Sequence, residues 1–578
     1  MKRNSKTGRA LSGKTLLELL AAAFILLGPS VLEGAVGGWG LYAVFILTAA
    51  VFVIRLIETK KIHISVNILL CGLCFLYALP VFFWAVSRYS HIKLIFTALT
   101  VTIGTMLTAD YLEIEKDRDI GNRLVSMMSV SALICAFWNL ISWVAFNGLS
   151  MDKAFSAGLG NSDLLGVFML VGLWCCAKTF GGRKKPGAAI VVMDLPMVFV
   201  LIMSRSLLTG LCGGLFALCY SIKKHKSLQC AWWGLVTAAS AAALLLMGTS
   251  PKMTPFADGL FRGMLNPGGL GGGGFIFRQD QYQSVYYVIT ELGTGADMAS
   301  SLGVVGLLAC VAFIGWALYL TISKSSWQCA FGSTLCMFAF FVPLGGGLAS
   351  LVLLMGVLVY GEWSQERVLT LKVGRGSTVV AGLIAVLAVY SCVLAVGEGI
   401  KAAGVNGLYT DPRNGVQKLT SAAKLNPFDG ESCFMAAQGY RQLYEAEGVR
   451  NDIVNAEYYI EKAIERDEGC ARYYALQACI KADSGDPAGA VELDRLTMEQ
   501  APLWEDCRVQ MAEHLYALIQ TVEKGSLTAQ KYHLEILGLS DEVSDMDRKK
   551  TINDFADRAQ DYIRKDFGFE QPEEDYQE

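Results

Sequence analysis

Hydrophobic and polar positions divide the chain into two parts. Before residue 398, hydrophobic runs of mostly 17 to 22 residues alternate with short polar connections. A helix that rises about 1.5 Å per residue needs roughly 20 apolar residues to cross a hydrocarbon layer about 30 Å thick. The runs therefore predict about twelve to thirteen transmembrane helices, at 15–36, 39–57, 66–86, 92–109, 124–146, 164–180, 188–204, 206–222, 230–247, 302–322, 327–344, 348–360 and 379–396.

Basic residues in the connections predict the orientation of these helices, because Lys and Arg are enriched on the cytoplasmic side. If residues 1–14 form a cytoplasmic N-terminus, the connections on that side hold 22 Lys and Arg, against 6 on the other side. An odd number of spans then places the chain after residue 398 outside the cytoplasm. We expect a multi-pass plasma-membrane protein over 15–398 with an extracytoplasmic C-terminal domain.

Residues 248–301 form the long extracytoplasmic loop of this membrane half. The loop contains a run of glycines, Gly268, Gly269 and Gly271 to Gly274, which we interpret as a hinge. From Phe277 to Leu292, apolar residues recur at spacings of three and four. This periodicity predicts an amphipathic helix lying in the membrane interface.

After residue 398 the chain becomes polar, and its pattern changes to pairs of helices. Three segments look like equivalent ends of successive pairs: 422–428, 461–468 and 496–502. Ala463 and Thr497 are 34 residues apart, which is the period of tetratricopeptide repeats. We expect an all-α domain of such hairpins over 399–560, followed by an acidic tail at 561–578.

Composition narrows the classes of function. Hydrophobic residues make up 53% of the 578 residues and the formal net charge is −3, so nothing indicates nucleic-acid binding. The 16 cysteines have no metal-site spacing. Walker A, HExxH and nucleophile-elbow motifs do not occur. We expect no cofactor and no metal, and the lipid bilayer is the first expected partner.

Arginines on the outer side are candidates for substrate binding. Arg205 lies in a tight turn between two spans, Arg278 begins the amphipathic segment, and Arg262 lies earlier in the same loop. Guanidinium groups bind phosphate oxygens bidentately and stay charged at any pH, so they suit a diphosphate-linked lipid. The plainer alternatives are snorkelling of Arg205 to lipid phosphate and ordinary solvation of the loop arginines.

Polar residues next to the spans are the other candidates. Asp297 and Glu291 flank the sequence LGTGA before the tenth span. A carboxylate near the membrane boundary can have a raised pKa and act as general base towards a sugar hydroxyl, or it can cap a helix. Asn161 and Asp163, before the sixth span, carry the same two interpretations as substrate-binding or capping residues. Arg88 is a further substrate-binding candidate, with anchoring at the interface as its alternative.

Five segments, taken in order, carry a family resemblance: 76–93, 158–170, 201–211, 277–295 and 301–316. They resemble the O-antigen ligase and polymerase-like superfamily of membrane glycosyltransferases, in particular members with C-terminal tetratricopeptide repeats. The resemblance implies that a glycan is joined or polymerised from an undecaprenyl-diphosphate carrier on the outer leaflet. It also implies that Arg205 and Arg278 hold the diphosphate. The repeats would bind an acceptor glycan or a protein.

The sequence departs from that superfamily at one point. Its ligases carry a histidine in the outer loop after the Arg-containing helix, and here no histidine occurs between His225 and His514. Either Asp297 or Glu291 supplies the base, or the chain is a polymerase-type member, or it is not catalytic. Two other classes stay open: a flippase or transporter for lipid-linked saccharide, and a non-catalytic scaffold for envelope assembly.

Overall fold

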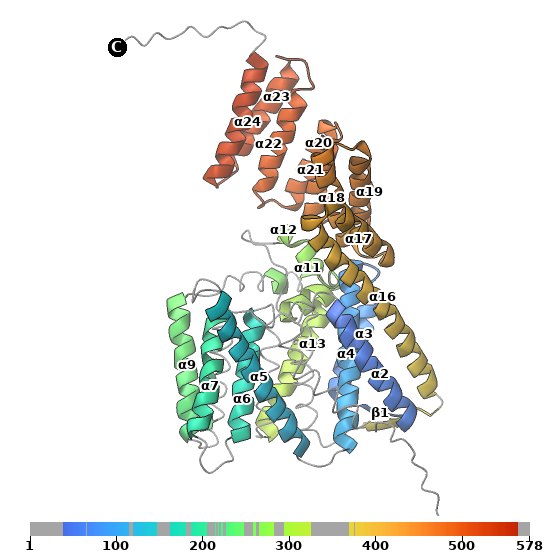
Figure 1. Ribbon diagram of the computed structural model, residues 1–578, viewed down its shortest axis with the longest axis vertical. Helices are drawn as coiled ribbons and strands as arrows, with labels where there is room; N and C mark the ends of the chain where they lie inside the picture. Colours follow the sequence, from blue (N-terminus) through green and yellow to red (C-terminus); the bar gives the residue numbers. More distant parts are fainter. Residues whose placement is uncertain are drawn as a thin grey trace, which may run out of the picture. The chain divides into compact units, whose positions relative to one another are not determined.

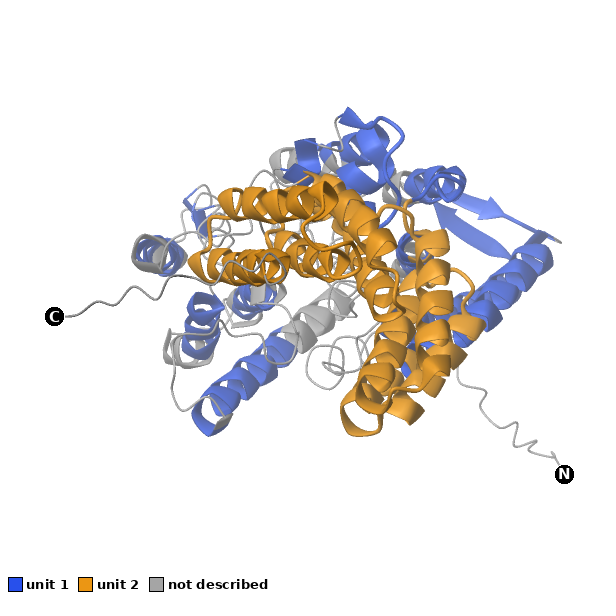
Figure 2. Cartoon of the chain, turned by 90° about the horizontal axis from the view of Figure 1, so that it is seen from above, with its two compact units in different colours: residues 1–85, 90–275, 289–399 blue, residues 86–89, 276–288, 400–578 orange. Residues whose placement is uncertain are grey.

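The computed structural model describes residues 39–64, 66–114, 119–146, 162–180, 187–204, 214–215, 218, 221–222, 227–247, 258–261, 265–282, 294–324, 369–374 and 376–564. These residues are helical apart from turns and one two-stranded sheet, which confirms the all-α fold class. The chain divides into two compact units, coloured separately in Figure 2. Unit 1 comprises 1–85, 90–275 and 289–399, and unit 2 comprises 86–89, 276–288 and 400–578.

The helices of unit 1 coincide with predicted hydrophobic runs (Figure 1). They are α2 (Trp39–Thr59), α3 (Val66–Val81), α4 (Arg88–Ile114), α5 (Asp119–Phe146), α6 (Ser162–Phe180), α7 (Gly187–Met203), α9 (Ser227–Met247), α13 (Thr294–Lys324) and α16 (Gly376–Thr410), whose last turns continue into unit 2. The predicted spans 15–36, 327–344 and 348–360, and most of 206–222, lie outside the described residues.

Close backbone approach holds the group of helices α5, α6 and α7 together. Leu165, Phe168 and Leu173 on α6 are fully buried. At Gly172 an added Cβ would lie 2.3 Å from the Cβ of Ala132 on α5 and 2.9 Å from the sulfur of Met197 on α7. Small residues at such crossings let helices pack by van der Waals contact alone. Glycine is therefore required where α6 passes between its neighbours.

Other helices of unit 1 turn an apolar face outward. On α16, Val379, Leu383, Val386 and Val389 are each 63 to 67% exposed, and their spacings of three and four residues place them on one stripe. Among the described residues, α2 and α16 have the length and apolar composition needed to cross a membrane. Shorter apolar stretches lie within α3, α5, α7, α9 and α13.

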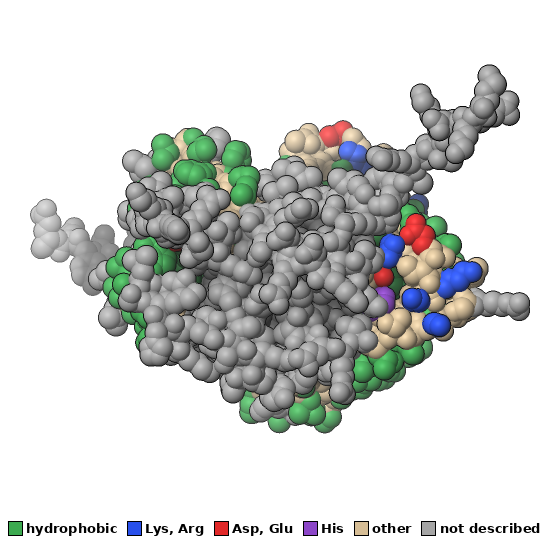
Figure 3. Space-filling model, turned by 90° about the horizontal axis from the view of Figure 1, so that it is seen from below, with side chains coloured by type: hydrophobic (Ala, Val, Ile, Leu, Met, Phe, Trp, Pro, Cys, Tyr) green, Lys and Arg blue, Asp and Glu red, His purple; other side chains and the backbone are tan. Residues whose placement is uncertain are grey.

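A small sheet and a charged cluster lie at one end of unit 1. Strand β1 (Lys61–Ile64) pairs antiparallel with β2 (Leu369–Lys372), with Lys61 opposite Lys372. Beside the sheet, Asp110 Oδ2 accepts from Arg55 Nε at 2.7 Å, and Asp110 Oδ1 lies 3.4 Å from His63 Nε2. Figure 3 shows basic, acidic and histidine side chains gathered at one side of the molecule beside hydrophobic surface. The sequence patterns did not predict this sheet.

Unit 2 contains helical hairpins, and the starts of two of its helices follow directly from local sequence. Its helices are α17 (Pro412–Leu425), α18 (Gly430–Glu447), α19 (Arg450–Arg466), α20 (Ala471–Asp483), α21 (Pro487–Gln500), α22 (Asp506–Ile519), α23 (Leu527–Asp541) and α24 (Met546–Arg564). Asp411 and Asp486 cap α17 and α21 through their carboxylates, each followed by proline at the first helical position. Both features favour helix initiation.

The segments 422–428, 461–468 and 496–502, which the sequence predicted to be equivalent helix ends, occupy equivalent positions in the structure. They lie at the ends of α17, α19 and α21, where Ala422, Ala463 and Thr497 each accept a hydrogen bond from the amide four residues later. Successive helices pack in antiparallel hairpins, α18 on α19 and α20 on α21, and α22 packs on α23 and α24. The prediction of helical-hairpin repeats is confirmed.

A buried ion pair crosses from α21 to α22 in unit 2. His514 Nδ1 lies 2.6 Å from Asp494 Oδ2, and Asp494 Oδ1 accepts from Gln510 Nε2 at 2.8 Å. Burial opposes a charge on His514, but hydrogen bonds with Asp494 and Cys479 outweigh it and raise the pKa of His514 to about 9. Since an unperturbed histidine has a pKa of about 6.5, the folded state favours protonated His514.

The raised pKa predicts that stability falls with increasing pH. The contribution of His514 is fully present below about pH 6.5 and is lost as pH rises through about 9; it amounts to roughly 3 kcal/mol at ~1.4 kcal/mol per pKa unit. Hydrogen exchange of α21 and α22 in the full chain, corrected for intrinsic rates, should accelerate over this range. His514→Gln should remove the dependence. The same pH dependence in both proteins would contradict the assignment.

Candidate functional site

The glycine-rich part of the outer loop packs against the start of α13. The amide of Leu270 donates to the carbonyl of Ser300 at 2.8 Å, and that of Gly271 to Ser301 at 3.0 Å. In a regular helix these carbonyls would accept from amides four residues later. Instead α13 is interrupted at Gly303, which has φ 61° and ψ −148°.

Glycine is needed on both sides of this contact. A Cβ on Gly269 (φ 73°) would lie 2.3 Å from the carbonyl oxygen of Ser301, and one on Gly303 would lie 2.2 Å from that of Pro267. A Cβ on Gly271 (φ 83°) would meet the Cβ of Ala85 at 2.4 Å. The interpretation of the glycine run as a hinge is therefore wrong: its backbone is held in close contact and by hydrogen bonds.

His91 ties the same loop to the turn between α3 and α4. Its Nδ1 accepts from the amide of Gly272 at 2.9 Å, and its Nε2 lies 2.7 Å from the carbonyl oxygen of Ala78. Because an amide can only donate, Nδ1 is the acceptor and Nε2 carries the proton. Trp84 Nε1 also donates to the carbonyl of Gly268, at 3.2 Å. The neutral His91 ring is thus occupied in holding the loop.

Asp297 is the carboxylate next to this loop. It lies in the first turn of α13, on the short helical segment before the break at Gly303 and before the apolar span predicted at 302–322. Its Oδ1 accepts from Ser301 Oγ at 3.1 Å, and its carbonyl accepts from Ser300 Oγ at 3.1 Å. Burial raises the pKa of Asp297 to about 6, although the Ser301 hydrogen bond opposes the rise. A half-buried carboxylate with this pKa can take a proton near neutral pH.

Of the remaining candidate residues, the structure describes some and not others. Asp163 lies in the first turn of α6, where its side chain is outside the described residues. Arg88 is exposed at the start of α4. Four candidates lie outside the described residues: Arg205, Arg262, Asn161 and Glu291.

Arg278 belongs to unit 2, in the segment 276–288. The predicted amphipathic helix from 277 is interrupted there, because Arg278 is a turn residue between α11 (Gly274–Phe277) and α12 (Gln279–Tyr282). Its Nη2 donates to the carbonyl of Glu468 at 3.2 Å. The described contacts of Arg278 are therefore with a turn of the helical hairpins, an arrangement that sequence patterns did not indicate.

The different surroundings of Gly303 and Gly315 predict a difference in stability between two substitutions in α13. Gly303→Ala should destabilise the protein by roughly 1–3 kcal/mol, since its positive φ and its contact with Pro267 leave no room for a methyl group. Gly315→Ala is the matched control, because open space surrounds Gly315, and we expect it to be neutral or to stabilise by about 0.5–1 kcal/mol. Thermal unfolding of the detergent-solubilised chain measures both. Equal unfolding midpoints for the Gly303→Ala and Gly315→Ala variants would show that the contact between Gly303 and Pro267 does not contribute to stability.

Comparison with known proteins gives little guidance. No protein-family model matches the chain, and no curated protein matches it. Among solved structures, the chain is similar to the crystal structure of yeast Tom70, at 12% sequence identity over 85% of this chain and 97% of that one, with a TM-score of 0.22. A TM-score this low does not establish a common fold.

Proposed function

We propose that unit 1 is a polytopic membrane domain. Two observations support this: the exposed apolar stripe of α16, and the spacing between polar ends along individual helices. On α4, His91 and Asp110 are 19 residues apart, which is about 28 Å along a helix axis. On α16, no charged residue occurs from the first residue, Gly376, until Glu398, 22 residues later, or about 33 Å. Both lengths match a hydrocarbon layer about 30 Å thick.

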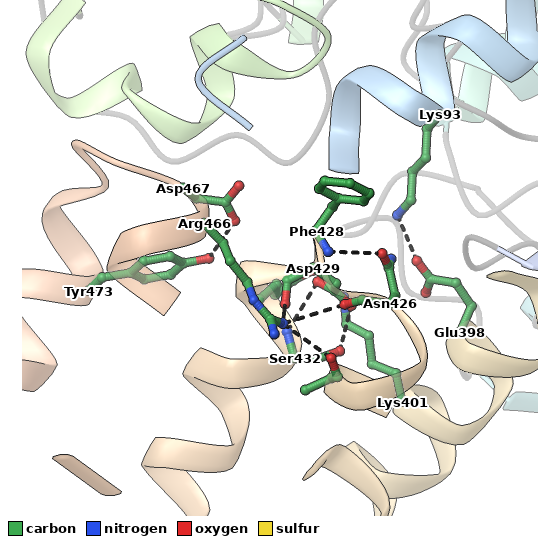
Figure 4. Close-up of polar contacts among 12 residues, drawn as sticks. Lys93, Glu398, Lys401, Asn426, Phe428, Asp429, Ser432, Arg466, Asp467 and Tyr473 are labelled. Carbon is green, nitrogen blue, oxygen red and sulfur yellow. Dashed lines mark hydrogen bonds and ion pairs between the residues drawn. The ribbon is translucent and has the colours of Figure 1, made fainter. Parts of the chain in front are cut away.

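The polar ends also support the proposed orientation. Lys93 near the start of α4 lies 2.9 Å from Glu398 near the end of the apolar stretch of α16 (Figure 4). At the opposite ends of these helices, β1 and β2 pair and hold the exposed side chains of Lys61 and Lys372. Paired strands lie on one side of a bilayer, so an even number of crossings separates them. The predicted spans between them number ten, as this requires.

We further propose that the domain is a glycosyltransferase that uses an undecaprenyl-diphosphate-linked glycan on the outer leaflet. The observation that carries this proposal is Asp297, a half-buried carboxylate with raised pKa beside an ordered loop. As general base, Asp297 takes the proton of the acceptor hydroxyl. The hydroxyl oxygen then attacks the anomeric carbon of the donor. The bond to the diphosphate breaks and the anomeric configuration inverts.

The diphosphate leaving group needs positive charge in this mechanism. Arg205 and Arg262 are the outer-side candidates that the family resemblance and the loop position supply. Guanidinium groups placed at the diphosphate oxygens would stabilise the charge that develops in the transition state. Arg278 is a weaker candidate for this role, because its guanidinium already donates to the carbonyl of Glu468. The helical hairpins of unit 2 would recruit an acceptor glycan or a protein partner.

A transfer assay tests the proposed reaction. Purified protein in liposomes receives extracted undecaprenyl-diphosphate-linked saccharide and acceptor, and Asp297→Asn should lower transfer by roughly 10²–10⁴-fold, the usual contribution of a general base. Asp411→Asn is the control for the same chemical change, because Asn caps a helix as well as Asp does. Equal rates for wild type and Asp297→Asn would remove Asp297 from the mechanism.

The same assay has a pH dependence. Since the base acts deprotonated, the rate should rise with pH through about 6, the pKa of Asp297, and then level off. In Asp297→Asn the residual rate should lack this step. A step that persists in the variant would assign the titration to another group.

A non-catalytic scaffold is the second candidate. The contact between Arg278 and the carbonyl of Glu468 supports it, because there an outer-loop arginine serves docking instead of substrate binding. This candidate predicts no transfer by any variant. If such liposomes scramble the lipid-linked donor between leaflets, the flippase alternative is favoured instead.

A further inference from the structure

Unit 2 contains a short segment that precedes its helical hairpins in sequence by more than a hundred residues. Of the segment 276–288, residues 276–282 are described. Its phenylalanine, Phe277, is half-buried against a hydrophobic cluster formed by α17, α18, α19 and α20. Ala437, Ile460 and Tyr473 are among the buried members of that cluster. The segment thus contributes an aromatic side chain to a core made by other elements.

The next residue binds the backbone of the turn between α19 and α20, at 467–470. Arg278 Nη2 donates to the carbonyl of Glu468 at 3.2 Å. Gly469, with φ 84°, leaves the guanidinium its space, because a Cβ there would lie 2.8 Å from Arg278 Nε and 3.1 Å from Cζ. The carbonyl of Glu468 and the free space at Gly469 together form a binding site for a planar cation.

A third residue adds charge complementarity. Burial raises the pKa of the Asp280 carboxyl, and attraction to Arg472 at the start of α20 opposes the rise. The same turn receives a second early segment, since the Ser87 side chain hydrogen-bonds the Asp467 carboxylate. Asp467 Oδ2 also lies 3.4 Å from the Tyr473 hydroxyl, as Figure 4 shows.

We infer that the α19–α20 turn and the adjoining cluster form a peptide-binding site for a segment with an aromatic residue, arginine and an acidic residue in the order F-R-x-D. In this structure the chain's own residues Phe277 to Asp280 occupy the site. Recognition uses the aromatic anchor Phe277, the Arg278 guanidinium on a backbone carbonyl and the attraction between Asp280 and Arg472, and Gln279 between them is buried as well. Phe277, Arg278 and Asp280 are each only half-buried, so the segment can open locally without unfolding the hairpins. A peptide of the same chemistry supplied from outside therefore competes with it.

Binding of a peptide to the full chain tests this inference without any measurement of glycan transfer. The probe is a fluorescent peptide with the sequence of residues 273–284, followed by fluorescence polarisation. The double variant Phe277→Ala with Arg278→Ala should bind it about tenfold or more tightly than wild type does, because the internal segment no longer fills the site. The probe carrying the same two alanines should not bind the double variant.

Two further proteins keep the outcome unambiguous. Arg450→Ala, which removes an exposed arginine at the start of α19, should bind the probe as weakly as wild type. The single variant Arg278→Lys guards against misfolding of the double variant, and it should bind the probe with an affinity between the two. Equal binding by wild type and both loop variants, or binding by none, overturns the inference.

Hydrogen exchange supplies a second measurement on the same proteins. Amides of residues 466–473 should exchange faster in the double variant than in wild type, and addition of the unlabelled peptide should restore the slow exchange. Unchanged exchange in the variant would mean that the turn does not depend on the segment, and it would contradict the binding site. Failure of glycan transfer would leave both results intact, so the two proposals fail separately.

Discussion

The hydrogen bonds from Leu270 and Gly271 to the carbonyls of Ser300 and Ser301 organise the candidate site. They divert two carbonyls from the helical pattern of α13, and the helix is interrupted at Gly303 as a result. Asp297 lies on the short segment that this break separates, next to Ser301. Without the loop amides, these carbonyls would accept from within the helix.

His91 extends this arrangement to the turn between α3 and α4. One ring nitrogen accepts from the loop and the other donates to the end of α3, so a single neutral side chain on α4 connects α3 with a loop distant in sequence. Asp110, near the other end of α4, joins Arg55 and His63. Between Lys93 and Asp110 the helix carries no charged residue, as our membrane proposal requires.

Unit 2 depends on a different principle. Helices α17, α18, α21 and α23 begin with a side-chain cap. Helices α17, α19 and α21 end with the same amide-to-carbonyl bond, at Ala422, Ala463 and Thr497. Stacked hairpins bury small residues between helices and leave their turns accessible. In the α19–α20 turn Asp467 and Cys470 are buried and Glu468 is exposed, and the Glu468 carbonyl accepts from Arg278. Our proposal of a peptide-binding site in this unit rests on that contact and on the packing of Phe277.

The apolar runs in the sequence predicted where the described helices of unit 1 lie, because run length and helix rise are local properties. The equivalent ends of α17, α19 and α21 were also readable, since caps and repeat spacing lie in contiguous sequence. The all-α class and a candidate carboxylate at Asp297 followed from the same patterns. Tertiary structure decided the rest: the packing of the glycine run, the pairing of β1 with β2, and the contact of Arg278 with Glu468. Each joins residues far apart in the chain and has a backbone group on at least one side; every residue type carries that group, so a sequence pattern does not show which residues meet.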